Sequence, residues 1–176
     1  MTAQGDPPPS PTAPKPPTQA PLSPVAMAAP VFPPLPGPDL LSLCSFPLEV
    51  ADYALKGYHL NAIVSPDQVL NAAADLDRAG LALDTITGVD WLVEGQMEVV
   101  YDYFHPNTGL RAVVRTKVPR ANPVLPSISQ VFPGANWHER ETHDFFGIEF
   151  AGHPNLAPFL LPEDATYHPL RKDFIA

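Results

Sequence analysis

Two histidines and a glutamate lie close together in residues 136–147, NWHERETHDFFG, and could form a zinc site. In zinc hydrolases the pattern H-E-x-x-H places two imidazoles four residues apart on one helix face, with the glutamate as general base. Here His138 and His143 are five residues apart. On a helix they diverge by about 140°, so they cannot share one ion without breaking the helix. We therefore expect no metal site, and a stand-alone histidine-based metalloprotein is the least favoured interpretation.

The sequence offers few other means of catalysis. It contains no G-x-G-x-x-G, no P-loop motif and no G-x-S-x-G, the patterns that build dinucleotide, phosphate and acyl-transfer sites. The histidines cluster at positions 138, 143, 153 and 168, and the neighbouring carboxylates that could act as general bases are Glu139, Glu141 and Asp144. Charged residues on a helix are more often structural than catalytic. We therefore expect an interaction subunit without catalytic residues rather than a self-contained enzyme.

Proline is concentrated at the N-terminus. The chain has 176 residues, 25 of them proline, with a formal net charge of −9, and fourteen of the prolines lie in residues 1–39. Such a segment has little to bury and many fixed φ angles, so we expect residues 1–45 to form a disordered extension. The proline-rich run could also bind an aromatic-lined groove, although a solvated spacer is the commoner use of such tracts.

Composition also excludes several classes of protein. The acidic chain has no basic stripe to neutralise phosphates, so we expect no nucleic-acid binding. No apolar run approaches the roughly 18 residues that span a bilayer, and residues 22–35 lack the basic start of a signal peptide. Cys44 is the only cysteine, so it can form neither an internal disulfide nor, alone, an iron–sulfur cluster. These features predict a cytoplasmic chain without a metal cluster of its own.

Residues 46–152 predict one α+β domain, in which helices cover a small mixed or antiparallel sheet. The apolar patterns predict strands over 58–64, 81–90, 97–104 and 110–118. Ser65 and Gln68 form a capping box that begins a helix, and Gly80 ends it. The apolar stripe of this helix is Val69, Leu70, Ala73 and Leu76, with the adjacent alanines. The strand over 110–118 alternates apolar with mostly basic residues. This pattern predicts a sheet with one face packed against the core and the other exposed to solvent.

A second helix is predicted in the segment that carries the histidines. Asn136 is a suitable N-cap with Glu139 at the third helical position, which makes a second capping box, and Gly147 ends the helix. Arg140 and Asp144 are four residues apart and could pair. Because charges alternate with aromatic residues here, the pattern supports equally a surface helix with an aromatic anchor and a helix that docks on another protein.

The C-terminal segment, residues 153–176, is here called the strap. It contains two His-Pro steps, and residues that precede proline avoid the α region, so we expect extended chain rather than helix. Its large apolar residues are Leu156, Phe159, Leu160, Leu161, Leu170 and Phe174. Such a segment must lie on a surface, either of its own domain or of a partner.

Residues 136–174 resemble the signature of the 30 kDa subunit family of respiratory complex I, the C-type subunit of bacterial NADH-quinone oxidoreductase. The family pattern runs E-R-E-x-x-D-x-F-G-I, then G-H-P-x-L, then H-P-L-R-K-D. The matching residues are Glu139, Arg140, Glu141, Asp144, Phe146, Gly147 and Ile148, then Gly152, His153, Pro154 and Leu156, then His168, Pro169, Leu170, Arg171, Lys172 and Asp173. The resemblance is strong over 127–174 and extends over 58–118 in element order only.

The resemblance implies a peripheral-arm subunit of a hetero-oligomer that binds no cofactor itself. Partner subunits would carry FMN and the iron–sulfur clusters, and the complex would oxidise NADH, reduce quinone and drive protons outward. The chain would pack beside the 49 kDa or D-type subunit that forms much of the quinone site. It would lie peripherally on the cytoplasmic face of the inner membrane, in contact with the membrane only through the complex. The signature residues, together with His143, would form or support the partner interface.

Two positions depart from the family pattern. His143 stands where the family usually has tyrosine or a similar aromatic residue, and Ala157 and Pro158 replace basic residues that commonly follow G-H-P-x-L. Related chains serve membrane-bound group 4 hydrogenases and ferredoxin-linked dehydrogenases, and this alternative stays open. The resemblance implies no contact between this subunit and the electron donor, so the sequence does not identify the donor.

Overall fold

Five strands of the computed structural model, which describes residues 44–175, form a mixed sheet in the order β1-β2-β5-β4-β3. The strands are β1 (Glu49–Val50), β2 (Leu60–Ile63), β3 (Ala82–Trp91), β4 (Gln96–Phe104) and β5 (Arg111–Pro119). β2 pairs with β5 in parallel, and the other neighbours are antiparallel. A second, parallel sheet joins β6 (Val124–Pro126) to β7 (Glu149–Ala151). This arrangement confirms the predicted α+β class.

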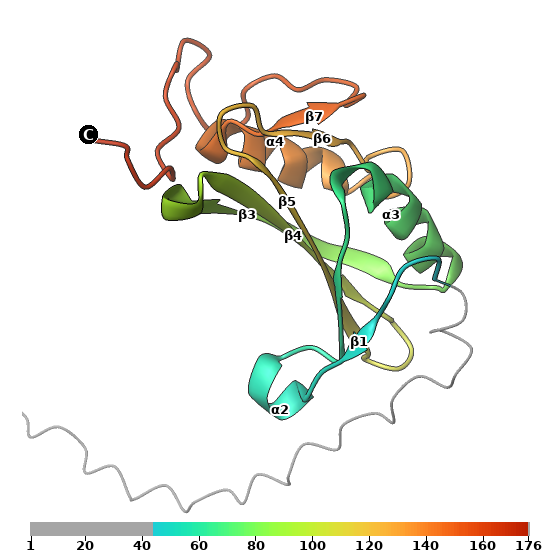
Figure 1. Cartoon of the computed structure of the whole chain (residues 1–176). Helices are drawn as coiled ribbons and strands as arrows, with labels where there is room; N and C mark the ends of the chain where they lie inside the picture. The colour runs from blue at the N-terminus through green and yellow to red at the C-terminus, as the bar shows by residue number, and fades with distance from the viewer. Residues whose placement is uncertain (1–43, 176) are drawn as a thin grey trace, which may run out of the picture. The chain divides into compact units, whose positions relative to one another are not determined.

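Two of the three helices that the structure describes cover one face of the large sheet (Figure 1). The helices are α2 (Tyr53–Lys56), α3 (Val69–Arg78) and α4 (Ala135–Phe146), with 3-10 turns η1 (Pro66–Gln68) and η2 (Leu92–Glu94). Figure 1 shows α3 and α4 on the same face, with α4 over β3 and the strap beside the end of α4. No helix in the described residues is long and apolar enough to cross a bilayer.

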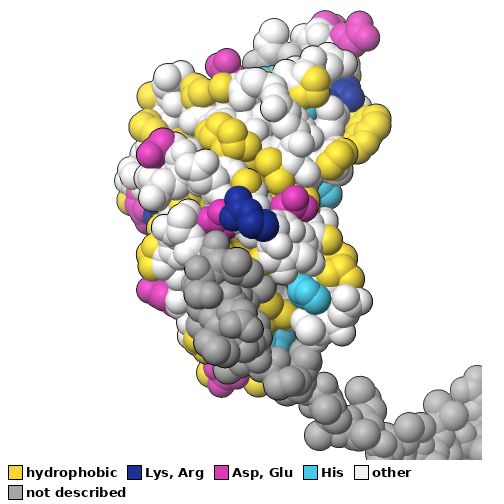
Figure 2. Space-filling model, turned by 90° about the vertical axis from the view of Figure 1, so that its right-hand side faces the viewer, with side chains coloured by type: hydrophobic (Ala, Val, Ile, Leu, Met, Phe, Trp, Pro, Cys, Tyr) yellow, Lys and Arg dark blue, Asp and Glu magenta, His cyan; other side chains and the backbone are white. Residues whose placement is uncertain are grey.

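Alternation along β4 and β5 builds the core. Met97, Val99 and Tyr101 point toward the helices and are fully buried, as the sequence predicts. The opposite face is charged, and Arg111 pairs there with Asp84 and Asp102. Figure 2 shows the face that carries α3, where the few Lys and Arg side chains are scattered among acidic and hydrophobic ones.

The helix α3 begins and ends as predicted. Gln68 Oε1 accepts hydrogen bonds from the Ser65 N–H (3.2 Å) and hydroxyl (3.0 Å), and Gly80 follows the helix with φ +82°. The predicted apolar stripe is wrong at one position, because Leu70 is 40% exposed. The rest of the predicted stripe is buried, including Ala72, one of the adjacent alanines, beside Val69, Ala73 and Leu76.

The capping box predicted for α4 is wrong. The helix begins at Ala135 with Gly134 as N-cap and no side-chain cap, and Glu139 is fully buried among other elements. Gly147 ends the helix as predicted, at φ +70°. The short elements β1, α2, β6 and β7 have no counterpart among the predicted elements. Strands of two or three residues are too short to show an alternating pattern.

Candidate functional site

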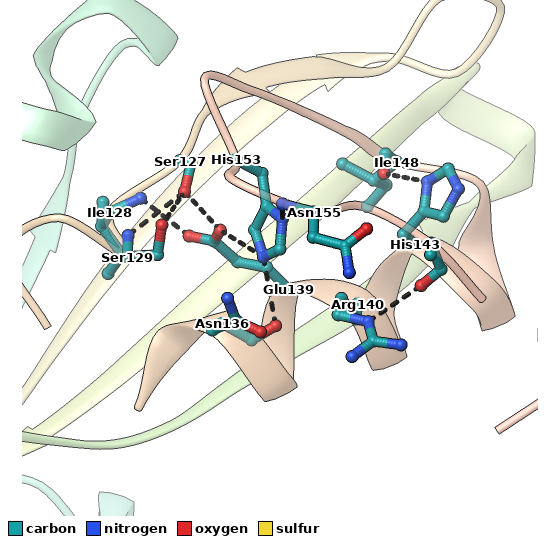
Figure 3. Close-up of polar contacts among 11 residues, drawn as sticks. Ser127, Ile128, Ser129, Asn136, Glu139, Arg140, His143, Ile148, His153 and Asn155 are labelled. Carbon is teal, nitrogen blue, oxygen red and sulfur yellow. Dashed lines mark hydrogen bonds and ion pairs between the residues drawn. The ribbon is translucent and has the colours of Figure 1, made fainter. Parts of the chain in front are cut away.

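The inward side of α4 carries Glu139, whose carboxylate joins the helix to the loop after β6. Figure 3 shows this carboxylate bonded to Ser127 and Ile128. The Ser127 hydroxyl donates to Oε2 at 2.6 Å, and the Ile128 N–H donates to Oε1 at 2.7 Å. Burial raises the pKa of Glu139 to about 7, although both hydrogen bonds favour the charged form. Glu139 therefore holds the loop after β6 against α4.

His153, the first residue of the strap, lies against the start of α4. Its Nε2 lies 3.2 Å from the Asn136 carbonyl, and its Nδ1 accepts the Asn155 N–H at 3.0 Å. The same Nε2 is 3.8 Å from Glu139 Oε2. Burial lowers the pKa of His153, and with one nitrogen donating and the other accepting the ring is neutral. The contact with Glu139 is therefore not an ion pair, and His153 acts as a polar cap that anchors the strap next to the exposed Pro154.

Asp144 binds the middle of the strap. Its Oδ2 accepts the N–H groups of Phe159, Leu160 and Leu161 at 2.8, 2.7 and 3.1 Å. Burial alone would raise the pKa of Asp144, but these three donors outweigh it and hold the pKa below the ordinary value. A single carboxylate thus fixes three consecutive residues of a segment that has no helix or strand.

Arg140 binds the same part of the strap from the preceding turn of α4. Its Nε donates to the Ala157 carbonyl at 2.8 Å and its Nη2 to the Pro158 carbonyl at 2.7 Å. The guanidinium also lies over the rings of Trp137 and Phe159, at 5.4 and 5.1 Å from their centroids. The predicted Arg140–Asp144 pair is therefore wrong, because the two side chains bind backbone groups of the strap instead.

The second His-Pro step closes the C-terminal end of α4. The last carbonyls of a helix lack helical partners, and here the strap supplies donors. His168 Nδ1 lies 2.8 Å from the Asp144 carbonyl, the Leu170 N–H donates to Phe145 at 3.1 Å, and Arg171 Nε donates to Phe146 at 2.7 Å. Pro169, between these donors, is half-buried.

Glycine is required at position 147 for two reasons. Its φ of +70° disfavours other residues, and an added Cβ would lie 2.6 Å from Arg171 Nη2 and also against the His168 ring. His143, four residues earlier, is held by a 2.9 Å contact between its Nδ1 and the Ile148 carbonyl. Its ring meets the His168 ring edge-on at 6.5 Å.

The end of the strap binds the edge of the sheet through Asp90, a buried residue near the end of β3. Arg120 donates two hydrogen bonds to this carboxylate, from Nε at 2.8 Å and from Nη2 at 3.1 Å, and the Lys172 N–H donates a third at 2.8 Å. Arg120 also pairs with Asp173. Burial alone would raise the pKa of Asp90, but these donors hold it below the ordinary value. Asp90 and Arg120 are absent from the predicted site residues, because no local pattern links residues 30 positions apart.

The structure thus gathers most of the predicted site residues along one line, where α4 meets the strap. Glu139, Arg140 and Asp144 contact other parts of this chain, as do His168, Arg171 and Asp173. Phe146 packs against Gly88 of β3, where an added Cβ would lie 2.6 Å from its ring. Within the described residues, no group of three or more His, Cys, Asp or Glu side chains is placed to hold a metal. The use of these residues at a partner interface stays a prediction.

Comparison with known proteins identifies the same region. The family model described as "Respiratory-chain NADH dehydrogenase, 30 Kd subunit" matches residues 62–176. The C-type subunit of NADH-quinone oxidoreductase from Roseiflexus sp. (strain RS-1) is 43% identical over 119 residues, which cover 65% of this chain and 68% of the relative. The C-type subunit from Moorella thermoacetica is 36% identical over 122 residues, covering 68% and 82%.

Solved structures share the fold. A chain of an archaeal respiratory complex, the membrane-bound sulfane sulfur reductase, aligns with a TM-score of 0.68 at 27% identity over 78% of this chain and 82% of that one. The trypsin-resistant fragment of Nqo5 aligns with a TM-score of 0.53 at 30% identity, covering 62% and 89%. With the family match extending through both α4 and the strap, this chain belongs to the 30 kDa subunit family of respiratory-chain NADH dehydrogenase.

Proposed function

We propose that this chain is a non-catalytic peripheral-arm subunit of a proton-pumping NADH-quinone oxidoreductase. The observation that carries the proposal is the family match over 62–176, which spans the line of contacts between α4 and the strap. Those contacts use signature side chains to fix an irregular segment, and a fixed segment is a better docking surface than a mobile one because less ordering entropy is lost on binding.

The partner in this proposal is the D-type subunit that forms much of the quinone site. One relative, the C/D subunit of NADH-quinone oxidoreductase from Phocaeicola vulgatus, is 43% identical over 93 residues, which cover 52% of this chain but only 18% of the relative. Its name joins C and D in one chain, and fused subunits are normally neighbours. By extension, this chain would lie at the cytoplasmic face of the inner membrane and reach the membrane only through the complex.

Cofactor chemistry belongs to other subunits in this proposal. FMN and the iron–sulfur clusters would lie on partners, with NADH and quinone as substrates of the whole complex. The sequence supports this division, because a single cysteine cannot supply the four thiolates that such clusters usually need. Two of the three carboxylates on α4 support it too, since Glu139 and Asp144 are engaged by donors of their own chain.

The test is a pull-down of the tagged chain from detergent-solubilised native membranes, followed by a native gel stained for NADH dehydrogenase. We expect the chain in a large, NADH-active band. Migration of the chain alone, in the soluble fraction, would contradict the proposal.

A second candidate is the equivalent subunit of a group 4 hydrogenase or a ferredoxin-linked dehydrogenase. The likeness to a chain of the membrane-bound sulfane sulfur reductase favours it, because that respiratory membrane complex is named for the reduction of sulfane sulfur and not for that of quinone by NADH. A large band that stains for hydrogenase and not for NADH dehydrogenase would select this candidate.

A further inference from the structure

The strand β3 presents an open edge. It pairs with β4 along its length, and in the described part of the chain no strand pairs with its other side. Natural edges are usually protected by charges, prolines or bulges. A bulge lies at Asp84, but the following residues, Thr85–Val89, have neither charge nor proline. This stretch is therefore suited to pairing with another strand.

A groove runs along that edge. One wall is formed by four consecutive residues, Thr85–Gly88, and the other by α4 and the strap through Glu141, Thr142, Phe145, Phe146 and Leu170. Side chains of consecutive strand residues point to opposite faces. A hollow lined by four of them in a row therefore follows the backbone edge rather than either face of the sheet. Its volume is about 210 Å³.

The chemistry of the groove is apolar with one acid. Phe145 is half-buried and Leu170 is 53% exposed, so apolar surface is available to a ligand. Glu141 is half-buried, and its carboxylate makes no hydrogen bond or ion pair within residues 44–175. The acids of the same signature, Glu139 and Asp144, are both bonded internally. A half-buried carboxylate beside an apolar groove is complementary to a basic side chain of a partner.

We propose that β3 receives an extended strand of a partner subunit, which adds to the sheet along Thr85–Val89. The added strand would place an apolar side chain over Phe145 and Leu170 and a Lys or Arg against Glu141. Main-chain hydrogen bonds would supply affinity, and the two side-chain positions would supply specificity. This inference rests on the proposed function, because it takes the partner from the same respiratory complex.

Hydrogen exchange tests the backbone part of the proposal. Amide exchange in a peptide covering β3 is compared between the isolated full-length chain and the chain in the purified complex. In a strand, successive N–H groups point to alternate sides, so about half of the amides in Thr85–Val89 face away from β4. We expect these amides to exchange at least about tenfold more slowly in the complex.

The outcomes separate this inference from the proposed function. Unchanged exchange of β3 in a complex that contains the chain would overturn the strand addition and leave the proposed function standing. A chain that enters no complex would overturn both. Slow exchange in the isolated chain that depends on its concentration, with a dimer in size-exclusion chromatography, would identify a second copy as the occupant and overturn the partner proposal.

Charge reversal tests the side-chain part. Glu141→Lys is compared with Glu49→Lys, which reverses an exposed acid on β1 at the opposite edge of the same sheet. We expect Glu141→Lys to lower the amount of chain incorporated into the complex by about tenfold, since like charges in an interface repel. The melting temperature of the isolated Glu141→Lys chain should match that of wild type. Equal incorporation of the two variants would overturn the assignment of Glu141.

Discussion

Glu139, Asp144 and Asp90 are all buried acids, yet their environments differ. Glu139 has two donors in a fully buried position, and its pKa rises to about 7. Asp144 and Asp90 each have three or more donors, and their pKa values fall below the ordinary value although burial opposes this. Each donor favours the charged form while desolvation disfavours it, and at Asp90 the positive charge of Arg120 adds to the donors. Desolvation prevails at Glu139, whereas the donors and neighbouring charges prevail at the two aspartates.

The raised pKa of Glu139 predicts a pH-dependent stability. A folded pKa above the unfolded value means that the folded chain holds the proton more tightly, so the stabilisation is full below about pH 4 and is lost as the pH rises through about 7. Glu139→Gln removes this titration. Relative to wild type, the variant should gain about 2–3 kcal/mol of unfolding free energy between pH 5 and pH 8.

Urea unfolding at both pH values measures this difference. The opposing titration of His153, whose pKa is lowered, is present in both proteins and largely cancels. Glu163→Gln, in an exposed part of the strap, is the control and should follow wild type. Parallel curves for Glu139→Gln and wild type would mean that the carboxyl group titrates like an exposed one.

The conformation of Gly147 gives a second prediction at this scale. Gly147→Ala must adopt a positive φ and also displace Arg171 and His168 from the end of α4. We expect a loss of about 2–4 kcal/mol of unfolding free energy. Gly57→Ala is the matched control, because its φ is +77° but no atom lies within 4 Å of the added Cβ. Gly57→Ala should lose only about 1 kcal/mol, and equal losses would show that the contact with the strap carries no energy.

At the scale of elements, the strap behaves as part of the fold. The middle of the strap binds the Asp144 side chain of α4. Farther along the strap, His168 and Arg171 bind the last carbonyls of α4, and Lys172 binds Asp90 of β3. These bonds satisfy helix carbonyls and buried carboxylates that would otherwise lack partners. The extended tail predicted from the two His-Pro steps is therefore ordered by side chains of other elements rather than by its own hydrogen bonds.

Asp90 and Arg120 allow the end of the strap to be tested. Arg120→Ala leaves the buried carboxylate of Asp90 without its bidentate partner, and we expect a loss of about 2–4 kcal/mol. Asp173→Ala removes only the half-exposed partner of Arg120 and should leave the melting temperature almost unchanged. Thermal melts of both variants at low ionic strength provide the comparison. Similar shifts would mean that Asp90 is not the anchor.

Elements with a local pattern could be predicted from the sequence, whereas long-range contacts could not. The strands β4 and β5 alternate regularly, and Ser65 with Gln68 forms the capping box before α3, so these predictions are confirmed. Glu139 fits a capping box equally well, but burial against Ser127 prevails over the local pattern. The contact between Lys172 and Asp90 spans 82 positions, and no local pattern in the sequence links two residues at that separation.

At the scale of the whole molecule, the described domain closes its core with its own residues. Phe46 is buried in the core, and the Ser45 N–H and hydroxyl donate to Asp75 at 2.8 and 2.7 Å, so the domain is already anchored at the residues that directly follow Cys44. Residues 1–39 contain fourteen prolines and three charged groups, a composition that contributes little apolar surface for burial.

Deletion of residues 1–39 should therefore leave both the fold and assembly intact. We expect a melting temperature within about 2 °C of wild type, because a change below about 0.5 kcal/mol shifts a domain of this size by no more than that. The truncated chain should also co-purify with the complex at wild-type yield. Removal of residues 162–176 is the contrasting variant, since it deletes the donors to the end of α4 and to Asp90 and should lower the melting temperature clearly. A normal melt combined with failed co-purification of the 1–39 deletion would make the proline-rich segment a docking element, the alternative that its sequence leaves open.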